Sequence, residues 1–308
     1  MTFGARFLSE PDLFPGRQSG EPWGDERVGL RCAGDTYVCR GLSPAQAAAV
    51  RVRFGRLCTP VDDSRGQGVE IRVFRASDRD FVHEGRDWEF DFDLDYSAAA
   101  VHFAGFRFLG RLDRGPPLSA ALWTPEDERL VSHAIFENTL RVVVAYNLLR
   151  RGSVLLHSAA AASDSGAHVF FGPSGAGKST IARILLGAGY AVLSDDMNAL
   201  HVRADGVFVE RLPFAGDLGQ TMETDGGVHP VRSLCRLEKG GTAGLRAAGP
   251  APAIAGLLEC APFVNRNPYG HDELVERLEA LHARSPVRVL TFAVDDGFLH
   301  LLDAREAG

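Results

Sequence analysis

A glycine-rich stretch in the second half of the chain combines residue types that can hold phosphate groups. Residues 172–180 read Gly-Pro-Ser-Gly-Ala-Gly-Lys-Ser-Thr and fit the P-loop (Walker A) pattern G-x-x-x-x-G-K-[ST] throughout. Glycines let backbone N–H groups converge on phosphate oxygens, and a lysine adds a full positive charge. A glycine-rich turn without a ligand is the alternative. We expect a nucleotide of the ATP type to be bound by Gly172, Pro173, Ser174, Gly175, Ala176, Gly177, Lys178, Ser179 and Thr180.

The sequence on either side predicts the elements that a P-loop needs. Residues 168–171 predict a short strand entering the loop, and residues 179–186 have the spacing of an amphipathic helix leaving it. The N-terminus of that helix would add a positive dipole to the phosphate site. The hydroxyl of Ser179 would then hold Mg²⁺.

Two carboxylates follow the next predicted strand. The apolar residues 190–193 precede Ser194, Asp195 and Asp196. Ligands of α/β sheets gather at the carboxyl ends of strands, and neighbouring strand residues point to opposite faces. One carboxylate can therefore address Mg²⁺ while the other faces a substrate hydroxyl. A helix N-cap or a solvated acidic turn is the competing interpretation, which the nearby P-loop disfavours.

A single histidine lies in the apolar run before the P-loop strand. Residues 154–159 predict a buried strand that carries His157. A lone histidine in such a run is usually a core residue with its ring hydrogen-bonded. By itself His157 therefore gives little reason to assign a function.

The order and spacing of His157, the P-loop, Asp195 and Asp196 resemble the catalytic domain of the HPr kinase/phosphorylase family. This family of P-loop protein-serine kinases is related to the phosphoenolpyruvate carboxykinases. The resemblance covers residues 154–198. It implies that Lys178 and Ser179 bind the triphosphate and Mg²⁺, that the two aspartates supply a base and a metal contact, and that His157 is an accessory active-site group.

The resemblance weakens after residue 198. Residues 212–219 lie where the family places a second acidic region, which implies that Asp217 is a metal or substrate contact, although an ordinary turn fits equally well. The family's glycine- and acid-rich signature for phosphorolysis does not follow, so the reverse reaction is not expected. Four basic residues beyond this point are candidates to guide a charged substrate, although surface positions explain each equally well: His229, Arg232, Arg236 and Arg266.

Together these features predict an ATP- and Mg²⁺-dependent kinase that transfers the γ-phosphate to a hydroxyl group. The chain is more similar to HPr-kinase-related, peptide-modifying kinases than to regulators of sugar transport, which implies a serine of a peptide or small protein as acceptor. A small-molecule kinase and a non-catalytic nucleotide-sensing protein are the alternatives. A transporter ATPase is disfavoured because residues 216–220 are a poor substitute for an LSGGQ-like signature, and no apolar strand ending in Asp-Glu follows.

Composition limits the partners. The net charge is −7 and no stretch gathers Lys and Arg, so we expect neither nucleic acid nor an anionic membrane as a partner. The apolar runs are too short for a membrane span, and residues 1–25 lack a secretory signal, which favours the cytoplasm. The five cysteines form no C-x-x-C pair and predict reduced thiols. Related kinases are often oligomeric, which is a weak argument for a homo-oligomer.

The elements predict an α/β fold in two parts. We expect a P-loop nucleotide-binding domain of the HPr kinase/PEP carboxykinase type at residues 125–308, after a smaller N-terminal α+β module at residues 1–124. A helix at residues 125–149 would form the junction, because Thr124 is a suitable N-cap. Alternating patterns predict half-buried antiparallel strands at residues 69–73, 88–94, 101–103 and 106–108.

Other parts of the chain give local predictions. Ser43 and Pro44 predict the start of a helix over residues 44–54. A second helix is expected at 272–283, with late strands at 287–294 and 298–302. The segment 240–256 is rich in Ala, Gly and Pro, and we expect it to be a surface loop or linker.

Overall fold

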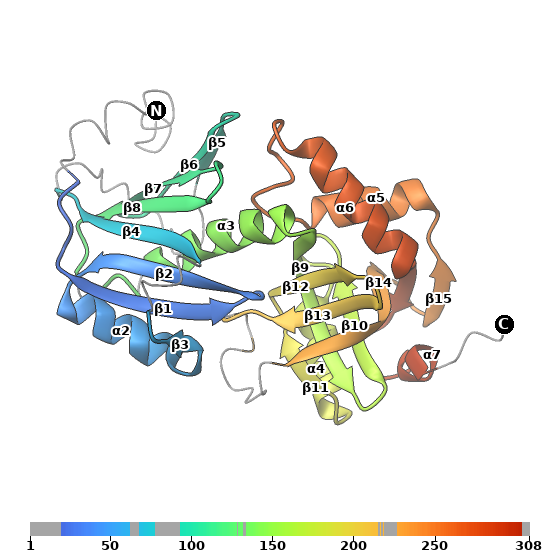
Figure 1. Cartoon of the computed structure of the whole chain (residues 1–308). Coiled ribbons are helices and arrows are strands. Elements are labelled where there is room, and N and C mark those ends of the chain that lie inside the picture. The colour runs from blue at the N-terminus through green and yellow to red at the C-terminus, as the bar shows by residue number, and fades with distance from the viewer. Residues whose placement is uncertain are drawn as a thin grey trace. The chain divides into compact units, whose positions relative to one another are not determined.

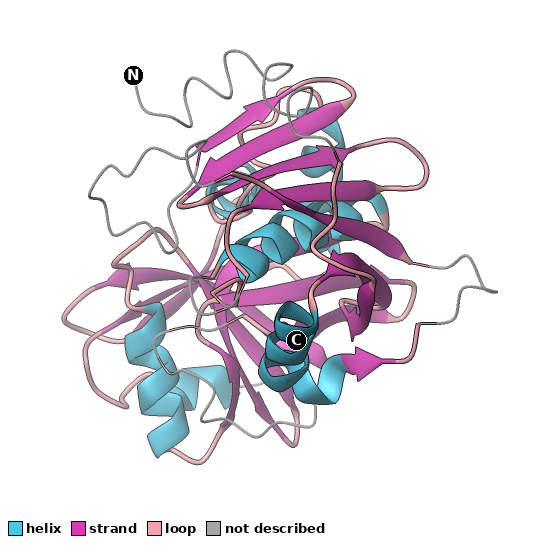
Figure 2. Cartoon of the chain, turned by 90° about the vertical axis from the view of Figure 1, so that its left-hand side faces the viewer, coloured by secondary structure: helices cyan, strands magenta, loops and turns pink. Residues whose placement is uncertain are grey.

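The computed structural model describes residues 20–61, 68–77, 93–127, 129–131, 134–214, 216, 218 and 227–303. The chain divides into two compact units, Met1–Asn147 and Leu148–Gly308, which we call the N-terminal and C-terminal units. The described chain is a mixed α/β protein in which strands outnumber helices in both units (Figures 1 and 2). None of the helices in the described ranges has the length and apolar character needed to cross a membrane.

The N-terminal unit is built on an eight-stranded sheet with the order β3-β1-β2-β4-β8-β7-β6-β5. Its strands are β1 (Glu26–Cys32), β2 (Asp35–Leu42), β3 (Cys58–Thr59), β4 (Val69–Arg75), β5 (Asp93–Tyr96), β6 (Ala100–Gly105), β7 (Phe108–Asp113) and β8 (Ser119–Thr124). Strand β4 runs parallel to both β2 and β8. The prediction of antiparallel strands is therefore wrong for β4. Long connections on both sides of β4 allow this arrangement, because parallel neighbours cannot be joined by a tight hairpin.

The helix α2 (Pro44–Phe54) begins and ends where the sequence predicts. The Ser43 hydroxyl accepts a hydrogen bond from the Gln46 backbone N–H at 3.1 Å, and the Gln46 side chain accepts one from the Ser43 N–H at 3.0 Å. This reciprocal capping satisfies two N–H groups that a helix start otherwise leaves unpaired. A 3₁₀ turn, η2 (Gly55–Leu57), follows.

The helix α3 (Ile135–Arg150) starts ten residues later than predicted, because Thr124 belongs to a strand. The Thr124 hydroxyl donates to the Arg107 carbonyl at 2.8 Å and accepts from the Glu126 N–H at 3.1 Å. Glu126 also pairs with the Arg107 side chain, which fixes this segment as a turn after β8. The division between the two units falls near the C-terminal end of α3.

The strands of the C-terminal unit pair in a closed ring, β10-β9-β12-β13-β14, with β14 returning to pair with β10. Strands β16 and β15 extend it from β14, and β11 pairs with β9. The strands are β9 (Ser153–Ser163), β10 (Gly166–Phe171), β11 (Ala191–Ser194), β12 (Met197–Arg203), β13 (Gly206–Arg211), β14 (Val228–Lys239), β15 (Gly244–Ala247) and β16 (Val287–Phe292). The helices are α4 (Lys178–Gly187), α5 (Pro250–Glu259), α6 (His271–Arg284) and α7 (Leu299–Asp303).

Two predictions for this unit are wrong. The segment 240–256 contains β15 and the first two turns of α5, because Pro250 at the first helical position precedes an apolar stretch that packs inward at Ala253 and Leu257. The predicted strand at 298–302 is the short helix α7, with Phe298 and Leu302 both buried in the core beside α4. Two apolar residues four apart suit one face of a helix as well as a strand.

Candidate functional site

The P-loop joins β10 to α4, as the sequence predicts. Phe171 is the last residue of β10 and Lys178 the first of α4. The glycines Gly175 and Gly177 have φ of 76° and 103°, in the left-handed region that side chains disfavour. A Cβ atom on Gly177 would lie 2.8 Å from the Phe292 ring, so this position also lacks space for a side chain. The backbone of the loop is therefore compatible with few residues other than glycine at Gly177.

The Lys178 side chain folds back over the loop. Its Nζ atom donates to the carbonyl oxygens of Gly172 at 2.9 Å and Pro173 at 3.2 Å, and the residue is buried. Burial lowers the pKa of the Lys178 ammonium, while Cys260, Asp196 and Glu259 act in the opposite direction. The ammonium is thus held at the loop by two carbonyls that a phosphate oxygen could replace as its acceptors.

The other predicted loop residues differ in exposure. Pro173, Ser174 and Gly175 are exposed, whereas Gly172 and Ala176 are buried. The Ala176 N–H donates to the Pro173 carbonyl at 3.1 Å, which closes the turn.

The helix that leaves the loop carries the last two predicted residues. Ser179 and Thr180, in the first turn of α4, are half-buried. The exposed tip of the loop and this first turn are accessible to a ligand.

The two adjacent aspartates have different environments. Asp195 is 6% exposed, and its Oδ2 accepts a hydrogen bond from the Leu218 N–H at 3.1 Å. A Cβ atom on Gly216 would overlap the Asp195 carboxylate, so the chain at Gly216 packs directly against it. Asp195 therefore fixes the segment after β13, and Asp196 is the more accessible carboxylate, with its side chain 19% exposed.

His157 lies beside Asp196. The strands β9 and β12 pair His157 with Met197, and the Ser158 N–H donates to the Asp196 carbonyl at 2.9 Å. These contacts set the His157 Nε2 atom 3.6 Å from Asp196 Oδ1, close enough for an ion pair when the ring is protonated. The His157 side chain is 41% exposed, unlike the core histidine that is the usual alternative.

Sequence reasoning missed a group of residues at the end of α5. Burial raises the pKa of the Cys260 thiol, and Lys178 and a hydrogen bond with the Gly172 backbone oppose that shift most strongly. Glu259 raises the pKa of Lys178 through its negative charge. The Cys260 carbonyl accepts a hydrogen bond from the His157 backbone N–H at 2.8 Å. No motif links these residues to the P-loop, because α4 and the strands β11 to β15 separate the loop from α5 in the chain.

Of the four basic candidates, Arg236 lies at the site. The parallel pairing of β10 and β14 sets Arg236 opposite Phe171, the residue before the loop, and Arg236 lowers the pKa of Cys260. Its side chain packs against Gly256 of α5, where a Cβ atom would lie 3.2 Å from Arg236 Cδ. The site therefore holds a second cation besides Lys178.

A bound metal would find few protein ligands here. Within the described ranges there is no group of three or more His, Cys, Asp or Glu side chains arranged to hold a metal ion. Ser179 and Asp196 are the predicted ligands that the structure describes, and Asp217 lies outside the described residues. This small set fits Mg²⁺, which is commonly held by one or two side chains together with substrate phosphates and water.

Comparison with known proteins adds no relative. No protein-family model matches the chain, and no curated protein matches its sequence. The function must therefore be argued from the residues and their geometry.

Proposed function

We propose that the protein is an ATP- and Mg²⁺-dependent kinase of the HPr kinase-like type that phosphorylates a hydroxyl group, namely a serine of a peptide or small protein. The observation that carries this proposal is the meeting of three elements: the P-loop with Lys178, Asp196 after β11, and His157 on β9. An accessible carboxylate beside the loop lysine can serve both Mg²⁺ and the hydroxyl of an acceptor, as a kinase requires. The Asp196 carboxylate acts on the Lys178 ammonium, which supports their closeness.

Three residues carry the proposed reaction, and Asp196 has two roles in it. Lys178 exchanges its carbonyl acceptors for oxygens of the terminal phosphates and neutralises their charge. The acceptor oxygen forms a bond to the γ-phosphorus, the bond from that phosphorus to the bridging oxygen breaks, and the hydroxyl proton passes to the Asp196 carboxylate. Ser179 and Asp196 would hold Mg²⁺, which supplies charge neutralisation at the phosphates.

The two remaining residues position this machinery. Asp195 holds the segment at Leu218 through a backbone N–H, so its contribution is to shape one wall of the site. His157 stabilises the Asp196 carboxylate when the imidazole is protonated, and the hydrogen bond from the Ser158 N–H to the Asp196 carbonyl keeps the two residues side by side. Most of the rate enhancement would come from positioning and charge stabilisation.

The test is transfer of labelled γ-phosphate from ATP, with Mg²⁺, to a panel of serine-containing peptides. Lys178→Met keeps the apolar stem but removes the charge, and we expect it to reduce transfer by about 100- to 1000-fold. Lys239→Met is the matched control, because Lys178 and Lys239 are the two lysines of the chain and Lys239 is exposed at the end of β14.

The outcomes separate the candidate functions. Labelled peptide that disappears with Lys178→Met and persists with Lys239→Met supports the peptide kinase. Labelled small metabolites without labelled peptide would replace it with a small-molecule kinase. ATP binding with no transfer to either class would make the protein a nucleotide sensor.

A further inference from the structure

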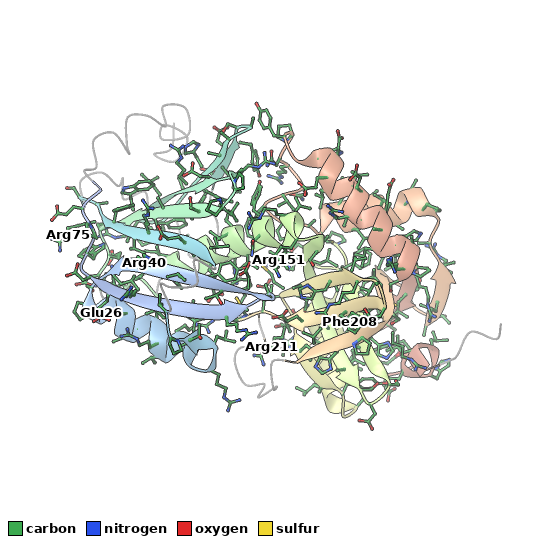
Figure 3. The ribbon with its side chains drawn as sticks, viewed as in Figure 1. Glu26, Arg40, Arg75, Arg151, Phe208 and Arg211 are labelled. Carbon is green, nitrogen blue, oxygen red and sulfur yellow. The ribbon has the colours of Figure 1, made fainter. Side chains whose placement is uncertain are left out.

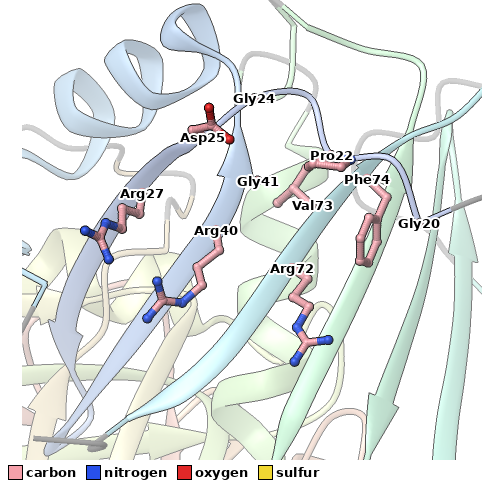
Figure 4. A pocket seen from close by; sticks show the side chains of 10 residues that line it. All are labelled: Gly20, Pro22, Gly24, Asp25, Arg27, Arg40, Gly41, Arg72, Val73 and Phe74. Atoms are coloured by element: carbon pink, nitrogen blue, oxygen red, sulfur yellow. The ribbon is translucent and has the colours of Figure 1, made fainter. Parts of the chain in front are cut away.

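Three arginines form a row across the sheet of the N-terminal unit. The antiparallel pairing of β1 and β2 sets Arg27 opposite Arg40, and the parallel pairing of β2 and β4 sets Arg40 opposite Arg72. Residues in register on neighbouring strands share one face, so all three side chains project from the same side (Figure 4). Because strands lie about 4.8 Å apart, the row spans only about 10 Å between its outer members. The side chains of this unit, Arg40 among them, are drawn in Figure 3.

This row lines a groove of about 390 Å³. One end is closed by the segment before β1, where the Trp23 N–H donates to the Gly41 carbonyl at 2.9 Å and the Arg75 N–H to the Glu21 carbonyl at 2.8 Å. Pro22 and Phe74 give this end an apolar lining. Asp25 also lines the groove, so the groove combines three arginines and one carboxylate with an apolar end, and backbone hydrogen bonds hold its walls.

The row already contains one carboxylate. Glu70 lies on β4 next to the groove, and its two oxygens accept from Arg40 Nε at 3.2 Å and from Arg72 Nε. Like charges placed opposite one another on a sheet destabilise it, so Glu70 offsets part of the cost of the row. The contacts of Glu70 also demonstrate that a carboxylate fits between the guanidinium groups of Arg40 and Arg72. Arg72 nevertheless keeps 64% of its side chain exposed, with further N–H donors for a second anion.

We propose that this groove binds a carboxylate-bearing segment of the peptide substrate, a proposal that rests on the kinase function above. Guanidinium groups match the planar carboxylate and bind it with two parallel hydrogen bonds. An aromatic or aliphatic side chain of the same segment packs against Phe74 and Pro22. A long polyanion such as nucleic acid fits less well, because the chain as a whole carries a charge of −7.

The experiment measures binding of a fluorescein-labelled peptide that alternates Glu with apolar residues and contains one Phe and one Ser, so that the same peptide can also accept phosphate. Its control is the same peptide with Gln in place of every Glu. Fluorescence anisotropy should show at least tenfold weaker binding of the Gln peptide, and Arg72→Gln should weaken binding of the Glu peptide by about tenfold. Arg31→Gln is the matched control, because Arg31 is exposed on the same face of β1 but does not line the groove.

A second variant gives a gain that misfolding cannot imitate. Glu70→Gln removes the internal carboxylate from Arg40 and Arg72, and it should tighten binding of the Glu peptide several-fold. Equal binding of both peptides, equal losses in Arg72→Gln and Arg31→Gln, or unchanged binding in Glu70→Gln would overturn the proposal. So would tighter binding of a single-stranded oligonucleotide that is lost in Arg72→Gln.

The same assay separates this proposal from the kinase function. Lys178→Met should bind the Glu peptide as the wild type does, because Lys178 belongs to the other unit. Peptide binding that depends on Arg72, in a protein that transfers no phosphate, would sustain the groove as a peptide site and remove the kinase. Phosphate transfer at equal rates to the Glu and Gln peptides would support the kinase function and contradict the groove as a peptide site.

Discussion

The sheet of the N-terminal unit and the strand ring of the C-terminal unit carry their charged side chains in different places. In the N-terminal unit the arginines of the groove lie within β1, β2 and β4, on one face of the sheet. In the C-terminal unit Lys178 and Asp196 follow the ends of β10 and β11, and Lys178 is buried.

These placements suit different tasks. A charge on an open sheet face is solvated and can hold a ligand by electrostatic attraction, but it exerts little control over a reacting atom. A charge withdrawn from water at a strand end acts more strongly and keeps a fixed position. We infer that the first unit suits recognition and the second suits chemistry.

The largest expected effect concerns the two aspartates of the C-terminal unit. Asp196→Asn should lower the rate of phosphate transfer by about 10²- to 10⁴-fold and reduce nucleotide affinity much less, because it removes the proton acceptor but keeps one oxygen for Mg²⁺. Asp195→Asn keeps an oxygen for the Leu218 N–H and should lose less activity. Steady-state kinetics with both variants, alongside nucleotide titration, makes the comparison. Equal losses in both would mean that their different burial does not set their roles.

Removing a buried charge from the N-terminal unit should affect stability instead. Glu137 accepts from Arg141 and Arg53, each at 2.9 Å, and the Glu137 and Arg141 side chains are less than a tenth exposed. Glu137→Ala leaves Arg141 buried without this carboxylate and should lower the free energy of unfolding by about 3–5 kcal/mol. Urea denaturation measures it.

The control for this prediction is an exposed pair. Glu238 and Arg246 lie 3.0 Å apart with 42% and 61% of their side chains exposed, so Glu238→Ala should cost less than about 1 kcal/mol. Similar costs for the two variants would contradict the distinction between buried structural charges and exposed ones.

Both units contain a buried thiol that should weaken the fold at alkaline pH. Burial raises the pKa of Cys235 in β14 from 9.0 to about 11, and burial also raises the pKa of Cys39 in β2. Below pH 9 the thiol is protonated in both the folded and the unfolded chain, and stability is at its full value. As the pH rises towards 11 the unfolded thiol ionises first, so the free energy of unfolding falls. For Cys235 the loss is roughly 3 kcal/mol.

Unfolding measured between pH 8 and 11 tests this prediction for Cys235. Cys235→Ala should show a shallower decline in stability than the wild type over that range. Identical slopes would show that Cys235 does not control the alkaline limit. Cys39→Ala provides the same comparison in the N-terminal unit.

The loop glycines should show a smaller effect than the loss of the buried ion pair. Gly177→Ala should cost about 1–3 kcal/mol, because the residue has a positive φ of 103° and its Cβ would approach the Phe292 ring. Gly175 also has a positive φ, but a Cβ atom there would meet open space, so Gly175→Ala should cost less. Thermal unfolding and nucleotide titration of both variants test the order. A larger cost at Gly175 would mean that the loop changes shape on binding.

Much of the fold follows from local signals in the sequence. The capping pattern at Ser43 predicts α2, and the P-loop motif predicts the junction of β10 and α4, because both depend on residues close together in the chain. The late start of α3 could not be predicted so simply, since Thr124 makes its decisive bond with Arg107 of a preceding turn. The parallel direction of β4 likewise depends on pairing with distant strands.

The same limit applies to the candidate site. The types and spacing of Lys178, Asp195 and Asp196 suggest their roles, but only the fold separates a buried aspartate from an accessible one. Cys260 and Arg236 reach the loop through α5 and β14, and nothing local in the sequence marks them. The kinase function and its acceptor remain predictions, to be decided by the transfer assay.

The pairing of β10 with β14 also has a consequence for how the protein is made. His168 in β10 bonds to Ser233 in β14 at 2.8 Å, across 65 residues of chain. At a synthesis rate of about 5–20 residues per second, the ribosome completes β10 roughly 3–13 seconds before its parallel partner. The strand β10 cannot pair with β14 until β14 has been synthesised, whereas the whole N-terminal unit has been synthesised by then. The groove of the N-terminal unit is therefore synthesised in full before β14 is available to hold the P-loop strand in place.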